Sequence, residues 1–160
     1  MAVEIERKFL VVGDQWRSAV TSSTRIVQGY LASTPDVTVR VRVRGDRGYL
    51  TIKGRTSGIS RSEFEFAIPA DDAEAMLGEL ATGPVVEKTR HLIDVDGHIW
   101  ELDVFAGANE GLVMAEVELQ SAGESFRRPD WAGDEVSDDP RYYNVNLAKH
   151  PYSQWGADAT

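Results

Sequence analysis

The sequence lacks cysteine, has only three histidines and contains no long apolar run. Without cysteine, disulfides and thiolate metal sites are excluded, so any metal ligands must be oxygen or imidazole groups. We expect no histidine to be a ligand, because each stands alone on an outer strand face, beside a turn or before a proline: His91, His98 and His150. No stretch reaches membrane-spanning length, and no apolar run precedes Glu4. We therefore expect a cytoplasmic protein with no signal peptide and no membrane partner.

Positive charge is also scarce relative to negative charge. Lys and Arg number 17 against 26 Asp and Glu, which gives a net charge of −9. This balance argues against a nucleic-acid partner. The 160 residues carry 42% apolar side chains, and no linker or low-complexity segment interrupts them. The composition predicts one globular domain over residues 1–160.

What is abundant is alternation of charged and apolar residues. From Val37 to Arg44, four valines occupy one set of alternate positions, and Thr38 and three arginines occupy the other. Successive side chains of a strand point to opposite faces, so this stretch predicts a strand with one apolar and one cationic face. The segment Gly45–Gly48 predicts a hairpin turn after it.

The N-terminal stretch shows the same pattern with mixed charge. Glu4, Glu6 and Lys8 alternate with Ile5, Arg7 and Phe9. A strand there places two carboxylates and an ammonium in a row on one face. Arg7 falls on the other face, where we expect a surface or interface ion pair.

Six more strands and three helices complete the expected elements. The strands lie near residues 25–31, 49–55, 62–66, 85–95, 99–105 and 112–119, whereas Thr21–Thr24 is expected to interrupt the chain. Spacing predicts three helices. The first covers residues 15–20, is capped at Gly13–Asp14 and buries Trp16 and Val20, and the second covers residues 69–80. The third covers residues 140–149, is capped by Ser137 or Asp138 and buries Tyr143, Leu147 and Tyr142.

The charged faces of these strands can be read in two ways. The first is an open antiparallel sheet with its polar face in water. The second is a closed barrel of about eight strands with the charges inside. Arg and Glu dominate, each strand tends to carry one sign and Thr is sparse, which favours the barrel. The predicted fold is mainly β (α+β), an eight-stranded antiparallel closed barrel with a charged lumen, packed by a few helices including a C-terminal one.

A lumen of both signs suits a polyphosphate together with divalent metal. Arg and Lys bind phosphate oxygens, whereas carboxylates would repel them and are better suited to holding cations that bridge to the phosphates. Mg²⁺ or Mn²⁺ is expected, with one or two ions. The chemistry predicted is phosphoryl transfer, in which positioning and charge neutralisation supply most of the catalysis.

The segment Glu4-Ile5-Glu6-Arg7-Lys8 resembles the ExExK motif of the CYTH superfamily, the triphosphate tunnel metalloenzymes. The charged pairs of the later strands follow in the family's order, and residues 136–144 resemble the C-terminal helix region of its short bacterial members. The resemblance covers essentially the whole chain. It implies an eight-stranded antiparallel barrel that forms a tunnel for triphosphate compounds.

The resemblance also implies roles for individual residues. It assigns the metal to Glu4, Glu6, Glu116 and Glu118. It assigns the triphosphate to Arg40, Arg42, Lys53, Lys88 and Arg90, with help from Lys8. Glu4, Glu6 and Lys8 are the catalytic candidates, since one metal-site glutamate would orient or deprotonate the attacking water. The supporting tunnel residues are four carboxylates and a tyrosine. The carboxylates would hold a second metal or form salt bridges with the cations: Glu63, Glu65, Glu101 and Asp103. Tyr30 would lie near a tunnel mouth. The C-terminal helix would plug one end.

The first functional hypothesis is hydrolysis of a small triphosphate, foremost inorganic tripolyphosphate, to diphosphate and phosphate. A class IV-type adenylyl cyclase is the alternative, although the sequence lacks a His-Phe element near Glu4. Thiamine triphosphatase and a non-catalytic polyphosphate- or nucleotide-binding module remain open. The apolar outer faces of the strands suggest a homodimer.

Overall fold

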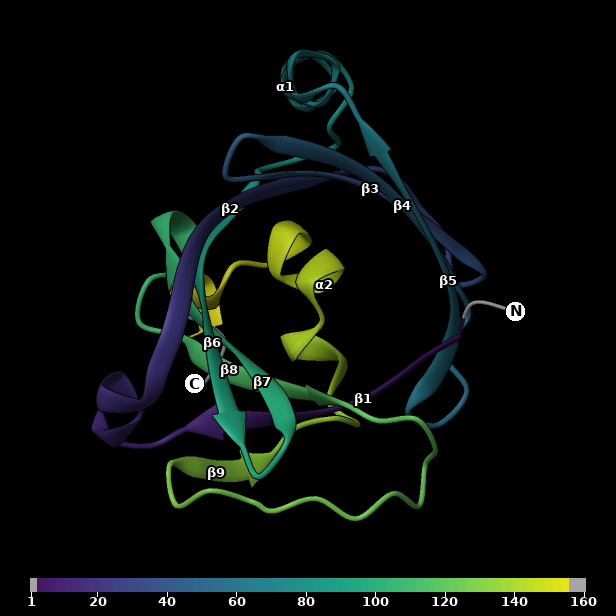
Figure 1. The fold of residues 1–160 in the computed structure, drawn as a ribbon. Helices are drawn as coiled ribbons and strands as arrows, with labels where there is room; N and C mark the ends of the chain where they lie inside the picture. The colour runs from purple at the N-terminus through teal and green to yellow at the C-terminus, as the bar shows by residue number, and fades with distance from the viewer. Residues whose placement is uncertain (1–2, 156–160) are drawn as a thin grey trace.

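Eight antiparallel strands close into a barrel in the computed structural model, which describes residues 3–155 (Figure 1). The strand order is β5-β4-β3-β2-β6-β7-β8-β1, and β5 pairs with β1 to close the ring. The barrel strands are β1 Val3–Val11, β2 Val20–Ser33, β3 Val37–Arg44, β4 Arg47–Gly54, β5 Ser60–Ile68, β6 Val86–Val95, β7 His98–Ala106 and β8 Val113–Glu118. The predicted fold class is confirmed.

β1 is the strand at which the barrel closes. Its first residues pair with β5, where Glu4 lies opposite Arg61, and its later residues pair with β8, where Lys8 lies opposite Glu116. Where β5 ends along this edge, a short strand that we did not predict takes its place. This strand, β9 (Ala132–Glu135), pairs with Phe9 and Val11. The interior face of β1 therefore carries Glu4, Glu6 and Lys8, as the alternation predicts.

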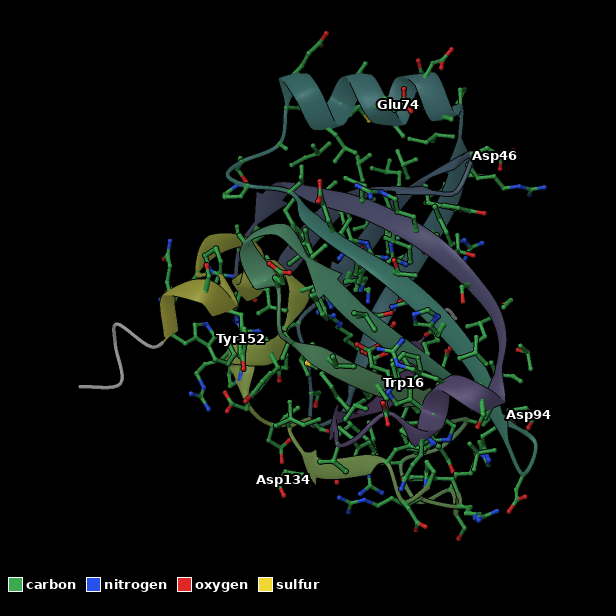
Figure 2. All side chains as sticks on the ribbon, turned by 90° about the vertical axis from the view of Figure 1, so that its left-hand side faces the viewer. Trp16, Asp46, Glu74, Asp94, Asp134 and Tyr152 are labelled. Atoms are coloured by element: carbon green, nitrogen blue, oxygen red, sulfur yellow. The ribbon has the colours of Figure 1, made fainter. Side chains whose placement is uncertain are left out.

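The hydrophobic core lies outside the barrel wall as well as at one of its ends. On the outer side of β1, β6, β7 and β8, Phe9, Trp100 and Trp131 pack with the 3-10 helix η1 (Gln15–Ala19) through its buried Trp16. On the outer side of β3 and β4 lies α1 (Ala70–Glu79), seen above the ring in Figure 1 and from the side in Figure 2. Gly48 permits this approach, because a Cβ there would come within 2.7 Å of the Ala73 Cβ.

The C-terminal segment folds back into the ring of strands. The short helices η3 (Pro140–Tyr142) and α2 (Asn144–Lys149) are drawn inside the ring in Figure 1, and η4 (Tyr152–Gln154) follows. Leu147 and Ala148 pack against the inward-facing Phe105 and Met114. The interior rows of the barrel change at this end from charged to apolar, and the C-terminal segment fills the space. The expected plug is present.

Several predicted boundaries are wrong. The helix over residues 140–149 is broken at Tyr143, whose φ of −70° and ψ of 135° are extended. Its cap is Asp139, which accepts from the Arg141 backbone N–H, and not Ser137 or Asp138. Tyr142 and Leu147 are buried, whereas Tyr143 is half-buried.

The start of β2 also differs from the prediction. Thr21–Thr24 continues this strand and does not interrupt the chain, because it pairs with β6 through a bulge near Val20. The preceding helix ends at Ala19 and has no side-chain cap from Asp14. Among residues 3–155, no helix is both long and apolar enough to cross a membrane.

Candidate functional site

The barrel encloses a cavity of about 190 Å³, lined mostly by charged side chains. Thirteen of the fifteen predicted site residues line it: Glu4, Glu6, Lys8, Tyr30, Arg40, Arg42, Lys53, Glu63, Glu65, Arg90, Glu101, Glu116 and Glu118. The other two, Lys88 and Asp103, are buried beside these residues, as their contacts with Arg90 and Asn144 show. The structure thus brings together side chains from all eight barrel strands, which the sequence placed on separate faces.

Carboxyl groups gather on one side of the cavity, on β1, β5 and β8. We call this set the acidic wall: Glu4, Glu6, Glu63, Glu116 and Glu118. Burial, followed by the charges of Glu116 and Glu4, raises the pKa of Glu6 well above its usual range. Burial and a hydrogen bond to Glu4 raise the pKa of Glu63 to about 7. Burial and the charges of Glu4 and Glu101 also raise the pKa of Glu118. The acidic wall therefore holds more negative charge than its surroundings neutralise.

Two pairs of carboxyl groups lie close together in this wall. The pKa of Glu4 responds to Glu63, and that of Glu116 to Glu6. Burial raises the pKa of Glu4, but the hydrogen bond with Glu63 and the Lys53 ammonium outweigh it, so the net pKa is lowered. Lys53 Nζ lies 3.0 Å from Glu4 Oε1 and 3.3 Å from Glu63 Oε2. Lys53, predicted to bind triphosphate, lies on β4 but is bonded to the acidic wall.

Cations gather on the other side of the cavity, on β3 and β6. We call this set the basic wall: Arg40, Arg42, Lys88 and Arg90, each 8% exposed or less. Burial and the charges of Arg40 and Arg90 lower the pKa of Arg42 to about 9. Burial lowers the pKa of Lys88 to about 7. The charges of Arg90 and Arg42 lower it further, and together these effects outweigh the charge of Asp103, which raises it. The basic wall therefore holds positive charge that its carboxylate neighbours do not balance.

One carboxylate serves two of these cations. Arg90 donates two hydrogen bonds to Asp103, at 2.8 and 2.9 Å, and Asp103 also lies 2.8 Å from Lys88 Nζ. Arg90 further donates to Glu101 at 2.8 Å. Burial raises the pKa of Asp103, but Arg90 and Lys88 outweigh it and lower the net pKa. Of the two expected roles for Glu101 and Asp103, these contacts support pinning the cations.

The remaining predicted residues lie at the ends of the cavity or between the walls. Lys8 Nζ lies 3.4 Å from Glu116 and donates to the Tyr142 carbonyl at 3.2 Å, so Lys8 connects the acidic wall to the C-terminal segment. Glu65 accepts from Thr51 and lies 3.7 Å from Arg40. Tyr30 packs with the apolar residues of the plugged end. Tyr30 also lines the cavity, and its expected place near a tunnel mouth stays a prediction.

The sequence analysis missed several residues that line the cavity or contact its lining. Arg61, whose Nε lies 3.4 Å from Glu4, has the same strand parity as Glu63 and could have been found from that spacing. Gln28 shared an interior face with Tyr30 but was given no role, although it bonds to Arg42. Asn144 carries no such signal, because it reaches the site from the start of α2.

The acidic wall fits a divalent cation through its donor set and its charge. All its donors are carboxylate oxygens, which suit Mg²⁺ and Mn²⁺. Its two close carboxyl pairs, Glu4 with Glu63 and Glu6 with Glu116, bring like charges together, and a bound cation relieves that repulsion. Within residues 3–155, no three such groups already surround one point, so substrate oxygens and water must complete the coordination.

Comparison with known proteins agrees with this geometry. The sequence profile of the CYTH domain family matches residues 2–150. The chain is 48% identical to an inorganic triphosphatase from Acetivibrio thermocellus, over 97% of this chain and 99% of the relative. It is 40% identical to an inorganic triphosphatase from Nitrosomonas europaea, over 91% of this chain and 96% of the relative.

Solved structures show the same fold. One crystal structure of an inorganic triphosphatase has a TM-score of 0.64 at 38% identity, covering 92% of this chain and 95% of that chain. A protein from Pyrococcus horikoshii, 19% identical, has a TM-score of 0.59 over 74% of this chain and 80% of its own, which shows the fold alone. The family profile, the two relatives and the barrel with its charged lumen lead to one conclusion: the chain belongs to the CYTH domain family.

Proposed function

We propose that this chain, as one domain over residues 1–160, hydrolyses inorganic tripolyphosphate to diphosphate and phosphate in a reaction that depends on Mg²⁺ or Mn²⁺. The observation that carries the proposal is the charge separation in the cavity. Burial and like charge raise the pKa values of Glu6, Glu63 and Glu118 in the acidic wall. Burial and like charge lower the pKa values of Arg42 and Lys88 in the basic wall. A cation and a polyanion together neutralise both walls. The names of the two relatives, both inorganic triphosphatases, support the same activity.

In this proposal the basic wall binds the substrate. Arg40, Arg42 and Arg90, with Lys88 beside them, donate hydrogen bonds to the non-bridging phosphate oxygens. They also stabilise the charge that develops on the bridging oxygen when the bond to the terminal phosphorus breaks. Diphosphate then leaves with that oxygen. Lys8, between the walls, orients the terminal phosphate.

The acidic wall acts on the attacking water. The oxygen of this water forms a bond to the terminal phosphorus, and one proton of the water passes to a carboxylate of the wall and then to solvent. Glu4, Glu6, Glu116 and Glu118 would hold the divalent cation, which when bound supplies charge neutralisation and activation of water. Glu4 or Glu6 orients the water or accepts its proton. The supporting carboxylates hold the cations in place. Glu63 pairs with Lys53, and Glu65 with Arg40. Glu101 and Asp103 both pair with Arg90.

The size of the cavity favours a small substrate. Pockets for drug-sized ligands measure roughly 300–1,000 Å³, whereas this cavity measures about 190 Å³ and is closed at one end by α2. Inorganic tripolyphosphate carries no base, sugar or thiamine group to accommodate. ATP and thiamine triphosphate each add an organic group for which the charged lining offers few apolar partners.

The test is phosphate release from tripolyphosphate, ATP and thiamine triphosphate in parallel, with Mg²⁺, with Mn²⁺ and with EDTA, and with a cAMP assay on the ATP samples. Metal-dependent release that is fast with tripolyphosphate and slow with the others is expected. Formation of cAMP would overturn the proposal in favour of a cyclase. Tight binding of tripolyphosphate without turnover would make the protein a binding module.

A cytoplasmic location and a homodimer are further parts of the proposal. The dimer rests on apolar side chains of the outer face of β5, where Phe64 and Phe66 are 46% and 55% exposed. Light scattering after size exclusion measures the mass directly. Phe66→Glu should shift a dimer to monomer, and a monomeric parent protein contradicts this part of the proposal.

A further inference from the structure

Two neutral amide side chains connect two cations of the basic wall. Arg42 Nε donates to Gln28 Oε1 at 2.7 Å, and Gln28 Nε2 donates to Asn144 Oδ1 at 3.1 Å. Lys88 Nζ donates to the same Asn144 oxygen, also at 3.1 Å. Gln28 is fully buried, and Arg42 and Lys88 are 7% and 2% exposed. The four side chains form one chain of hydrogen bonds, which we call the amide bridge.

Other cations of the cavity are held by carboxylates. Arg90 is held by Asp103 and Glu101, and Lys53 by Glu4 and Glu63. Lys88 has both kinds of partner, because Asp103 lies 2.8 Å from its Nζ. A carboxylate satisfies the donors of a cation and also cancels its charge. An amide oxygen satisfies a donor but leaves the charge in place. Among the described residues, no carboxylate forms an ion pair with Arg42, and its side chain donates a hydrogen bond to Gln28.

We infer that Gln28 and Asn144 are positioning residues that hold Arg42 and Lys88 in place without adding negative charge beside them, and that this choice of amides sets the affinity of the cavity for the triphosphate anion. The inference rests on the proposed function, because it concerns the same substrate. It assigns to α2 a part in substrate binding beyond filling the end of the barrel.

Two further observations place unbalanced positive charge at this position. Burial, Arg40 and Arg90 lower the pKa of Arg42 to about 9, as expected of a guanidinium surrounded by like charge. The Nε atom of Arg40 is buried and, among residues 3–155, has no hydrogen-bond partner. A buried donor without a partner is costly unless a ligand supplies the acceptor. An anion beside the amide bridge would balance the charge of Arg42 and accept a hydrogen bond from Arg40 Nε.

The test replaces amide by carboxylate at constant shape. Gln28→Glu and Asn144→Asp keep an oxygen acceptor for Arg42 or Lys88 but add a charge that cancels theirs. Gln15→Glu, on the exposed surface of η1, adds the same charge to the same residue type outside the barrel. Binding of tripolyphosphate is measured by calorimetry in EDTA, and KM and kcat are measured with Mg²⁺.

Gln28→Glu and Asn144→Asp should each weaken tripolyphosphate binding roughly 10- to 100-fold and raise KM in step, which is the range for losing a hydrogen bond to a charged group. Gln15→Glu should leave both constants within about twofold of the parent protein. The thermal midpoint of Gln28→Glu should hold or rise, because the new carboxylate pairs with Arg42. A merely structural role for Gln28 predicts the opposite pattern, with a lower midpoint and unchanged affinity.

Unchanged affinity and KM in the folded variants, with a parent protein that hydrolyses tripolyphosphate, would overturn the inference and leave the proposed function standing. A parent protein that binds tripolyphosphate without hydrolysing it would overturn the proposed function, and the calorimetric comparison would still decide the inference. If Gln28→Glu does not fold, Asn144→Asp decides it alone, because Asn144 is only half-buried.

Discussion

The two walls of the cavity meet the same electrostatic problem in different ways. Each gathers like charges in a partly dry space, which is unfavourable on its own. The acidic wall relieves the repulsion by keeping protons, and Glu63 with a pKa of about 7 shows this. The arginines of the basic wall do not give up their protons in this way, although Lys88, with a pKa of about 7, can. The basic wall relies on shared carboxylates and amides, such as Asp103 and Gln28. Protons relieve the acidic wall, whereas neighbouring side chains hold the arginines of the basic wall.

Glu4→Gln removes one carboxylate from the acidic wall and tests this difference most strongly. Turnover of tripolyphosphate should fall by roughly a thousandfold, because the cation loses a ligand and its charge stabilisation of the transition state. Phosphate release at saturating Mg²⁺ measures the effect. Glu74→Gln, on the exposed face of α1, is the control and should retain full turnover (Figure 2). Full turnover by Glu4→Gln would refute the metal assignment.

Asp103→Asn tests how the basic wall tolerates its own charge. The free energy of unfolding should fall by roughly 3 kcal/mol, because Arg90 and Lys88 lose their shared buried carboxylate. Urea unfolding at neutral pH measures this, with Asp94→Asn on the exposed end of β6 as the control. A loss below about 1 kcal/mol would mean that Asp103 is not needed to stabilise the wall.

The same variant predicts a pH dependence. The pKa of Asp103 is lowered by folding, so its stabilisation is fully present above the ordinary value of 3.8 and is lost as the pH falls below it. The difference in unfolding free energy between parent protein and Asp103→Asn should therefore shrink as the pH is lowered through this range. A difference that stays constant with pH contradicts the assignment.

Arg42→Ala removes a cation that no carboxylate balances. KM for tripolyphosphate should rise roughly 10- to 100-fold, because a buried charge-assisted contact to phosphate is lost. Arg55→Ala is the matched control, since Arg55 is exposed and pairs with Asp36 outside the lumen. Equal KM values for the two variants would show that the basic wall is not the phosphate site.

Arg7→Gln tests an ion pair outside both walls and should have the smallest effect. Arg7 and Glu135 form two hydrogen bonds, at 2.6 and 2.9 Å, on the partly exposed outer face of β1. Partly exposed ion pairs contribute about 0–1 kcal/mol to stability. The free energy of unfolding should therefore fall by less than about 1 kcal/mol, and turnover should not change. A large loss of turnover would show that the outer face communicates with the lumen.

The sequence predicted the interior of the barrel better than its edges. The alternation from Val37 to Arg44 marks β3 to the residue, because a strand with one buried face fixes which side chains point inward. The same rule placed Glu4, Lys88 and Glu116 inside. Arg7 on the outer face, paired with Glu135, is likewise confirmed as a surface pair.

What alternation could not predict depends on contacts between distant segments. β9 has the sequence Ala-Gly-Asp-Glu, without apolar alternation, and is a strand only because the edge of β1 needs a partner there. The sharing of Asp103 between Lys88 and Arg90 depends on the relative register of β6 and β7. The place of Asn144 depends on where the C-terminal segment enters the barrel.

The pairing of β1 with β5, β8 and β9 has a consequence for the rate at which the protein folds. Arg7 and Glu135 are 128 residues apart in the sequence, Lys8 of β1 meets Glu116 of β8, and Glu4 of β1 meets Arg61 of β5 across the closing seam. Contacts of such separation require the closure of large loops before they contribute any stability, and proteins rich in them fold in milliseconds to seconds. Glu4, Glu6 and Lys8 lie on this same strand. A chain whose seam is still open has no cavity, so recovery of activity during refolding should coincide with the slowest phase of barrel closure.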